Sequence, residues 1–408
     1  MTKNYICAAA WASLHLWPNN NVYPCCMVDS TKSFGKLDAN VMNNEAFKKF
    51  RIEILSGNKV EVCKNCYTIE EAGQQSLRQS LNEKYLDKIQ DLISSTEEDG
   101  TADTKLLHWD FRSSNLCNYA CRTCGPELSS TYKQLSNRNS NIKGEKVLYI
   151  NSATREYLDK LIDDNIDCVE TIYFAGGEPL MMDEHASIIS KLLERNRTNV
   201  SLYYSTNGSR LSYKNINFLE EWKKFKEVTI VFSIDEIEDR AEYWRYGTNW
   251  LNVVPNISSA IEVAKANKNI RVWFSPTVSV FNISRLLDIH KYFREQGWFD
   301  TQHPEIIFNL LHTQEFYCVK NTNNEFKLFA ESKLNDYIDY LKTSSYKFDN
   351  NQVQKVEGLK SFLLEDGIDL KKEVTLHTAL LDRQRNESIF DVAPDLVDLL
   401  IDKQLYDK

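Results

Sequence analysis

Strand-like and helix-like segments alternate between residues 105 and 320, a periodicity that few fold classes share. Helical patterns, such as those at 185–194 and 257–266, separate six short apolar segments. We expect these segments to be strands, at 106–111, 171–174, 201–205, 228–234, 270–275 and 306–311. Strands that alternate with helices form βαβ units around a parallel sheet, and parallel barrels carry their chemistry at the carboxyl ends of the strands. The residues that follow each strand are therefore the first candidates for a site.

Three cysteines with C-x3-C-x2-C spacing follow the first expected strand: Cys117, Cys121 and Cys124. Three thiolates on one short loop can hold three irons of a 4Fe–4S cluster, for which four thiolates are usual. The fourth iron is then open to a ligand that is not protein. The alternative is zinc, but a structural zinc site takes four ligands and this loop offers three.

Composition places the chain among ordinary globular proteins, with 42% hydrophobic and 26% charged residues. The net charge of −9 argues against a nucleic-acid partner, because binding to a phosphate backbone needs a basic face. The ten cysteines fall in close groups, which is typical of metal or cluster ligation in a reducing compartment, so we expect a cytoplasmic protein. The apolar stretch 6–17 is not expected to be a signal peptide, and no stretch is long enough to span a membrane.

The region before residue 95 has a different character from the alternating region. The turn-rich residues 18–20 predict a β-hairpin between 13–17 and 21–25. Helical spacing predicts one helix over 45–55 and a second over 69–93. The polar residues 94–100 are typical of a linker, so we expect a separate N-terminal domain.

The stretch from Trp109 to Pro126 resembles the cluster loop of the radical S-adenosylmethionine (SAM) superfamily. In that family the open iron binds the amino and carboxylate groups of SAM, and an electron from the reduced cluster splits SAM into methionine and a 5′-deoxyadenosyl radical. The chain departs from the family at Thr123, where an aromatic residue is common. The resemblance implies a six-stranded partial barrel.

A second motif, Gly176-Gly177-Glu178-Pro179, follows the expected strand at 171–174. Two glycines let a ligand approach the backbone closely, and a carboxylate can accept hydrogen bonds from an ammonium group. The motif matches the Gly-Gly-Glu-Pro sequence of the family. This match implies contact with the amino group of SAM.

Polar residues also follow the third and fourth expected strands. Asn207 lies in a turn that resembles a common family turn. Ser233 and Asp235 are suited to hydrogen bonds with ribose hydroxyls, which is the role of this position in the family, or to capping a helix. Arg245 falls where related enzymes place an arginine, and it is a candidate partner of the SAM carboxylate or a surface residue.

Later strand ends supply weaker candidates. Ser275 or Thr277 is expected to face the methionine or adenosine part of SAM, and the family places adenine near Leu310 and Leu311. Cys318 follows the sixth strand and is either a hydrogen-atom donor, as in radical epimerases, or an inert cysteine. We expect Cys168 to pack in the core.

The N-terminal region resembles a SPASM/twitch domain, the accessory module of radical SAM enzymes that holds an auxiliary 4Fe–4S cluster. The resemblance implies four cluster ligands, Cys7, Cys25, Cys63 and Cys66, with Cys26 as the substitute for Cys25. Two neighbours in an extended chain point to opposite sides, so only one of Cys25 and Cys26 is expected to bind. A four-cysteine zinc site is the alternative.

The sequence therefore predicts an α/β protein with three parts: an N-terminal auxiliary-cluster domain at 1–95, a partial (β/α)6 TIM-like barrel at 105–320, and a helical C-terminal extension at 321–408. In the extension, helical patterns cover 326–341, 353–363, 379–385 and 393–401. The expected function is reductive cleavage of SAM and hydrogen abstraction from a peptide or protein, supported by a ferredoxin- or flavodoxin-type electron donor. A small-molecule substrate, such as a sugar or nucleotide derivative, is the first alternative. A zinc-stabilised, non-catalytic binding protein is the alternative of another class.

Overall fold

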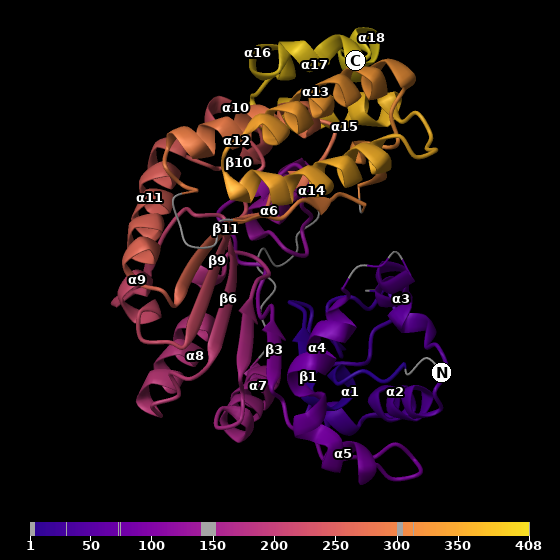
Figure 1. Cartoon of the computed structure of the whole chain (residues 1–408), viewed down its shortest axis with the longest axis vertical. Coiled ribbons are helices and arrows are strands. Elements are labelled where there is room, and N and C mark those ends of the chain that lie inside the picture. Colours follow the sequence, from indigo (N-terminus) through magenta and orange to yellow (C-terminus); the bar gives the residue numbers. More distant parts are fainter. Residues whose placement is uncertain are drawn as a thin grey trace. The chain divides into compact units, whose positions relative to one another are not determined.

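A computed structural model describes residues 5–29, 31–71, 73, 75–139, 152–299, 305–312 and 314–407 (Figure 1). The chain divides into two compact units. The first unit comprises residues 1–116, 145–204 and 224–228, and the second comprises 117–144, 205–223 and 229–408. Both units contain strands and helices, and most strand pairs of the main sheet are parallel, so the protein is a mixed α/β protein with a parallel sheet at its core.

The first unit contains a sheet in the strand order β2-β1-β3-β5-β6. These strands are β1 (Ser13–Leu16), β2 (Val22–Tyr23), β3 (His108–Phe111), β5 (Thr171–Phe174) and β6 (Ser201–Thr206), whose end passes into the second unit. β1 and β2 form the expected antiparallel hairpin. The other pairs are parallel, including β1 with β3, so the N-terminal region adds a strand to the sheet of the alternating region. The sequence analysis did not predict this pairing.

The two faces of this sheet differ in chemistry. Strand residues that point to one face are almost completely buried, for example Trp109, Phe174 and Tyr204. Helix α8 (Asp183–Glu194) covers this face, because the ring of His185 lies 4.6 Å from that of Phe174 and its Nε2 lies 3.0 Å from the Tyr204 hydroxyl. The alternate residues on the other face are mostly polar.

Short helices surround the sheet of the first unit. They are α1 (Ala9–Ala12), η1 (Val41–Asn43), α2 (Glu45–Leu55), η2 (Glu61–Cys63), α3 (Lys64–Glu71), α4 (Leu77–Tyr85), η3 (Leu86–Ile89), α5 (Gln90–Ser94), α7 (Ser152–Asn165), η4 (Pro179–Met181) and α8 (Asp183–Glu194). The prediction of a single helix over 69–93 is wrong. Gly73 has a φ of +75°, which a helix does not permit, and Ser76 starts α4 anew with a capping box to Gln79.

The second unit contains the later strands. They are β4 (Ala120–Cys121), β7 (Ser212–Tyr213), β8 (Ile216–Asn217), β10 (Arg245–Tyr246), β11 (Ile270–Phe274), β12 (Thr277–Val278), β13 (Glu305–Ile306) and β14 (Asn309–Leu310), while β9 (Glu227–Phe232) begins in the first unit and ends in the second. β11 pairs with β13 and β12 pairs with β14, both in parallel. The expected strand 306–311 is therefore split. Pro276 lies between β11 and β12, and a proline has no N–H to donate to the ladder.

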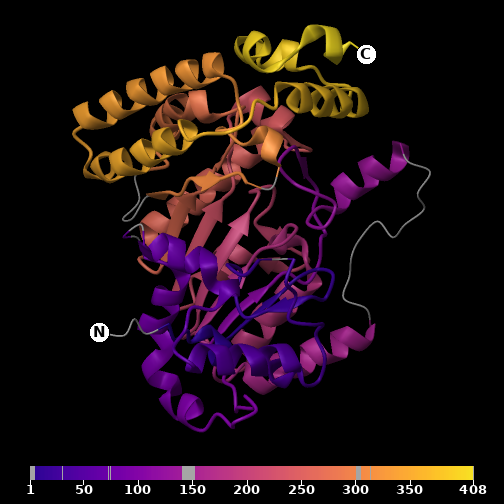
Figure 2. The same cartoon turned by 90° about the vertical axis from the view of Figure 1, so that its right-hand side faces the viewer.

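Helices make up most of the second unit. They are α6 (Ser130–Asn139), α9 (Phe218–Trp222), α10 (Glu238–Trp244), α11 (Trp250–Ala266), η5 (Ile283–Arg285), α12 (Leu286–Glu295), η6 (Glu315–Tyr317), α13 (Asn324–Thr343), α14 (Lys347–Leu363), α15 (Lys371–Arg385), α16 (Ile389–Val392), α17 (Pro394–Leu400) and α18 (Lys403–Tyr406). The helices expected in the C-terminal region are present, and α13 and α14 lie side by side (Figure 2). Across the described residues, no helix combines the length and apolar character that crossing a bilayer requires.

Candidate active site

The cysteine loop is held at its start and at its middle cysteine by hydrogen bonds. The Cys117 N–H donates to the hydroxyl of Ser130 at 3.2 Å, and the hydroxyl of Thr131 donates to the Cys117 carbonyl at 2.7 Å, so the first turn of α6 fixes the start of the loop. Cys121 lies in β4, which pairs with β10 so that Cys121 is opposite Arg245. All three cysteines of the loop are half-buried.

Side-chain N–H donors point at two of the three sulfur atoms. Asn207 Nδ2 lies 3.9 Å from the Cys117 sulfur, and Arg245 Nη1 lies 3.7 Å from the Cys121 sulfur. The backbone N–H of Tyr119 also lies 3.5 Å from the Cys117 sulfur. Burial raises the pKa of the Cys121 thiol, and the charge of Arg245 opposes that rise. Donors and positive charge favour thiolates, and thiolates are the ligands that an iron–sulfur cluster requires.

Asp235 orients Arg245 through a buried ion pair. One carboxylate oxygen of Asp235 accepts from Arg245 Nε at 2.8 Å, and the other accepts from the N–H of Thr277 at 2.7 Å. The Asp235 side chain is fully buried. Both of its oxygens are therefore engaged within the protein; the sequence analysis left ribose hydroxyls and a helix cap open as partners of this residue. Ser233 is half-buried, and its N–H donates to the Thr206 carbonyl.

Gly247 is a site residue that the sequence analysis missed. Its φ is +97°, and a Cβ at this position would lie 2.7 Å from the carbonyl oxygen of Asn118 in the cysteine loop. Only glycine permits both this conformation and this approach. A glycine two residues after Arg245 was the available signal, but the contact with Asn118 is invisible in the sequence.

The Gly176–Pro179 motif lies in the first unit, against the segment that leads into the cysteine loop. A Cβ on Gly177 would lie 2.3 Å from the Leu116 carbonyl oxygen, and one on Gly176 would lie 3.0 Å from the Cβ of Arg112. The Glu178 N–H donates to the Leu116 carbonyl at 2.7 Å, and its buried carboxylate accepts from the N–H of Leu180 at 3.1 Å. The two glycines therefore allow close packing of these two backbone segments.

Four cysteines of the N-terminal region line one small cavity: Cys7, Cys25, Cys63 and Cys66. Apolar side chains, including those of Val28, Phe50 and Leu81, and the charged side chain of Arg78 complete the lining. Cys26 is exposed and is absent from this lining. Four thiols in an apolar cavity are a donor set that fits a 4Fe–4S cluster. Within the described residues, no three His, Cys, Asp or Glu side chains are placed around a single metal-ion position.

Burial dominates the electrostatics of this cavity. It raises the pKa of the Cys7 and Cys63 thiols to about 12, and neighbouring thiols add to the rise. Such thiols are protonated in the free protein at neutral pH. Ligation of a metal centre would therefore release protons, as is usual for cysteine sites.

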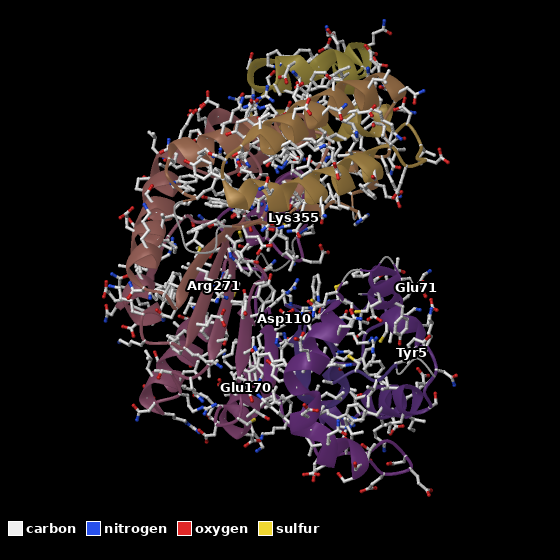
Figure 3. The ribbon with its side chains drawn as sticks, in the orientation of Figure 1. Tyr5, Glu71, Asp110, Glu170, Arg271 and Lys355 are labelled. Carbon is white, nitrogen blue, oxygen red and sulfur yellow. The ribbon has the colours of Figure 1, made fainter. Side chains whose placement is uncertain are left out.

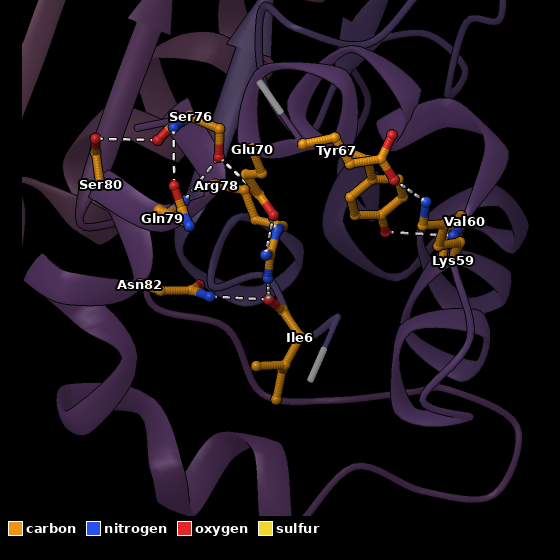
Figure 4. A network of polar contacts seen from close by, with 11 residues as sticks. Ile6, Lys59, Val60, Tyr67, Glu70, Ser76, Arg78, Gln79, Ser80 and Asn82 are labelled. Carbon is orange, nitrogen blue, oxygen red and sulfur yellow. Dashed lines mark hydrogen bonds and ion pairs between the residues drawn. The ribbon is translucent and has the colours of Figure 1, made fainter. Parts of the chain in front are cut away.

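Two arginines hold the surrounding N-terminal elements together. Arg51 is fully buried and donates to the carbonyl oxygens of Ala10 at 3.0 Å, Gly100 at 3.0 Å and Met42. Arg78 forms an ion pair with Glu70 and donates to the Ile6 carbonyl at 2.8 Å, next to Cys7 (Figure 4).

The polar face of the sheet carries a row of ionisable residues that the sequence analysis did not assign. His15, Asp110, Tyr173 and Tyr203 are register partners on four adjacent strands, so their side chains share one face. His15 Nδ1 lies 2.7 Å from an Asp110 carboxylate oxygen, and Arg112 also pairs with Asp110, which Figure 3 labels. The charges of Arg112 and His15 outweigh burial and lower the pKa of Asp110 to about 2.

The remaining predicted residues lie outside these groups. Ser275 donates to the Ile307 carbonyl and accepts from Asn309, while Leu310 ends β14 and Leu311 is buried. Cys318 is buried after η6, and its pKa is raised by that burial. Cys168 is half-buried, with its sulfur 3.2 Å from the Asn165 carbonyl oxygen.

Comparison with known protein families identifies the class. The radical SAM superfamily model matches residues 111–298, which contain the cysteine loop and the residues around it. A second model, the SPASM iron–sulfur cluster-binding domain, matches residues 7–67. The chain therefore contains a radical SAM domain and, before it, a SPASM-type iron–sulfur domain, and these domains imply a SAM-binding 4Fe–4S cluster, SAM itself and auxiliary iron–sulfur ligation.

Several solved structures match part of the chain at low identity. One is native anSMEcpe with bound SAM and a Cp18Cys peptide, at 14% identity over 66% of this chain and 64% of that chain, with a TM-score of 0.37. Another is SuiB from Streptococcus suis bound to its precursor peptide SuiA, at 14% identity over 74% and 62%, with a TM-score of 0.38. The chain thus spans less than two thirds of the length of these structures. A search of curated proteins found no match.

Proposed function

We propose that the protein reductively cleaves SAM and uses the resulting radical to abstract a hydrogen atom from a peptide or protein. The observation that carries the proposal is the convergence of Asn207 and Arg245 on the sulfur atoms of Cys117 and Cys121 in a matched radical SAM domain. When bound, the cluster supplies the electron that splits SAM into methionine and a 5′-deoxyadenosyl radical. The residues of the chain bind, orient and shield these groups.

Three cysteines, Cys117, Cys121 and Cys124, would hold the SAM-binding cluster. The residues proposed to bind SAM are Gly176, Gly177, Glu178, Pro179, Asn207, Ser233 and Arg245. Asp235 contributes through Arg245, because its carboxylate is engaged by that guanidinium and by the Thr277 N–H. Cys7, Cys25, Cys63 and Cys66 would hold the auxiliary cluster, and the exposure of Cys26 favours Cys25 as the ligand.

The proposed architecture is a partial (β/α)6 barrel at 105–320, preceded by the auxiliary-cluster domain at 1–95 and followed by the extension at 321–408. The parallel pairs of β3 with β5 and of β5 with β6 support the barrel. In such a barrel the polar sheet face of Asp110, Tyr173 and Tyr203 would face the lumen and offer hydrogen-bond partners to a polar substrate.

A peptide or protein is the favoured substrate class because SPASM relatives often modify ribosomally made peptides, and the SPASM model matches residues 7–67. anSMEcpe and SuiB were both solved with peptides bound. A sugar or nucleotide derivative is the alternative substrate. A reduced ferredoxin or flavodoxin in the cytoplasm would supply the electron.

The test is anaerobic reconstitution with iron and sulfide, followed by dithionite and SAM. About eight irons and release of 5′-deoxyadenosine are expected, since each cluster holds four irons. The variant Cys117→Ala/Cys121→Ala/Cys124→Ala should retain about four irons and should release no 5′-deoxyadenosine. Cys168→Ala, a cysteine outside both sets, is the matched control and should behave as wild type. Stoichiometric zinc with no SAM cleavage would refute the proposal and leave a zinc-stabilised binding protein.

A further inference from the structure

Arg122 connects the cysteine loop to the C-terminal helices of the second unit. It is fully buried and lies between Cys121 and Thr123 in the sequence. Its Nη2 atom forms ion pairs with Asp382 of α15 and with Glu387, the latter at 3.0 Å. The guanidinium also lies 3.8 Å over the Tyr243 ring.

Asp382 is the centre of this connection. Besides Arg122, its carboxylate accepts hydrogen bonds from the hydroxyl of Tyr243 at 2.9 Å, the hydroxyl of Tyr406 at 2.7 Å and the N–H of Ile389 at 2.9 Å. Three segments after residue 371 are therefore fixed to the cysteine loop. The fixed helix α15 carries a second arginine three residues later.

This second arginine, Arg385, is buried without an ion-pair partner among the described residues. It is 7% exposed, and its guanidinium lies 5.1 Å over the ring of Tyr246 in β10 and 5.9 Å over the ring of Tyr132 in α6. Among the described residues it makes no hydrogen bond or ion pair, and its Nε and Nη1 atoms are buried without an acceptor. Arg122 Nη1 is a third buried donor of this kind. Buried donors and charges without partners are costly, so the arrangement points to a missing anion.

The charges in this region agree with that interpretation. Burial lowers the pKa of Arg385 and repulsion from Arg122 lowers it further, while the nearby carboxylate of Glu387 opposes the shift. Tyr246 lies in β10, which pairs with β4 at Cys121, and Tyr132 lies in α6, whose first turn holds Cys117, so Arg385 packs against the two elements that hold the cysteine loop. Arg245 Nη1 lies 3.7 Å from the Cys121 sulfur, but Arg245 forms an ion pair with Asp235. Arg385 thus differs from Arg122 and Arg245 in that it has no ion pair within the described residues.

We propose that the missing anion is the thiolate-ligated cluster held by Cys117, Cys121 and Cys124, and that Arg385 raises its reduction potential. The inference rests on the proposed function. Such a cluster carries net negative charge, which increases by one on reduction, and nearby charges set its potential. The C-terminal extension would therefore be an electrostatic part of the radical site as well as a structural one.

The experiment compares Arg385→Met with wild type in the reconstituted protein, using a potentiometric titration followed by electron paramagnetic resonance. The signal that changes on addition of SAM identifies the relevant cluster. We expect a lower midpoint potential in Arg385→Met and a value near wild type in Arg385→Lys. Arg383→Met, an exposed arginine on the same helix, is the matched control and should leave the potential unchanged.

Unfolding of the iron-free protein provides a second measurement that does not depend on the cluster. Without the anion, removal of an unpaired buried charge should leave the Arg385→Met chain at least as stable as wild type. A structural role predicts a less stable chain instead, and that result would overturn the inference. An unchanged midpoint potential in Arg385→Met would also overturn this inference, but it would leave the proposed function standing. A wild-type protein without any SAM-responsive cluster would overturn the proposed function itself.

Discussion

At the scale of single residues, buried charges in the second unit carry most of the site's electrostatics. Asp235 and Glu236 are adjacent in sequence and both buried, yet their environments differ. Asp235 pairs closely with Arg245, while Glu236 makes a longer contact of 3.2 Å with Arg285. Desolvation therefore dominates at Glu236 and raises its pKa to about 7. The different environments of the two carboxylates cannot be predicted from the Asp-Glu pair in the sequence, because they depend on which distant arginine each carboxylate contacts.

Glu236 makes stability depend on pH. Its folded-state pKa of about 7 lies above the ordinary value of 4.5, so its contribution to stability is complete below pH 4.5 and is lost as pH rises to about 7. The free energy of unfolding of wild type should fall relative to Glu236→Gln by up to about 3 kcal/mol across this window. Urea titrations of both proteins at several pH values measure this difference in the free energy of unfolding. Glu262→Gln, an exposed carboxylate on α11, is the control, and parallel curves for wild type and Glu236→Gln would contradict the prediction.

The Asp235–Arg245 pair leads to a prediction about activity. Asp235→Asn keeps the shape of the side chain but removes the charge that orients Arg245. The rate of 5′-deoxyadenosine release should fall by about 10- to 100-fold, as is usual when a group that orients a ligand-binding residue is lost. Ser233→Ala, two residues away, should have a smaller effect. Equal losses in the two variants would mean that Asp235 does not act through Arg245.

At the scale of elements, local patterns predicted most strands, and contacts distant in sequence decided the rest. The strand at 171–174 is as expected, because apolar and β-branched residues specify it locally. The strand at 306–311 is interrupted because its partner contains Pro276, which lies far away in sequence. The helix over 69–93 was wrong because one glycine conformation and one cap divide it. The cysteine sets were recognisable from spacing, whereas the contact of Gly247 with Asn118 was not.

Gly247 provides a test of the element that holds the cysteine loop. Gly247→Ala should place a methyl group against the Asn118 carbonyl at a strained φ, which costs about 1–3 kcal/mol and displaces the loop. Iron content should fall together with the midpoint of thermal unfolding. Gly297→Ala is the matched control, because Gly297 also has a positive φ, of +68°, but nothing lies within 4 Å of its added Cβ. Similar iron contents in the two variants would show that the close approach is unimportant.

At the scale of the whole molecule, the N-terminal cysteine region shares a sheet with the first strand of the alternating region. The sequence predicted a separate domain ending near residue 95, followed by a linker. In the structure β1 pairs with β3, and Gly100 of the expected linker is buried against Lys48, where a Cβ would lie 2.2 Å from a carbonyl oxygen. The sequence could not show this continuity, since residues on β1 carry no signal for the strand that they pair with.

This continuity predicts that the first unit unfolds cooperatively. Arg51→Met removes a buried guanidinium and leaves the carbonyl oxygens of Ala10, Met42 and Gly100 without its N–H donors, so it should cost about 3 kcal/mol or more. Because β1 and β3 are paired, the loss should shift the unfolding of residues from both strands together, which hydrogen exchange of β1 and β3 amides can follow. Lys49→Met, an exposed residue on the same helix, should leave exchange unchanged. If β1 amides exchanged faster in Arg51→Met while β3 amides kept their protection, the cysteine region would be an independent domain that only borders the sheet.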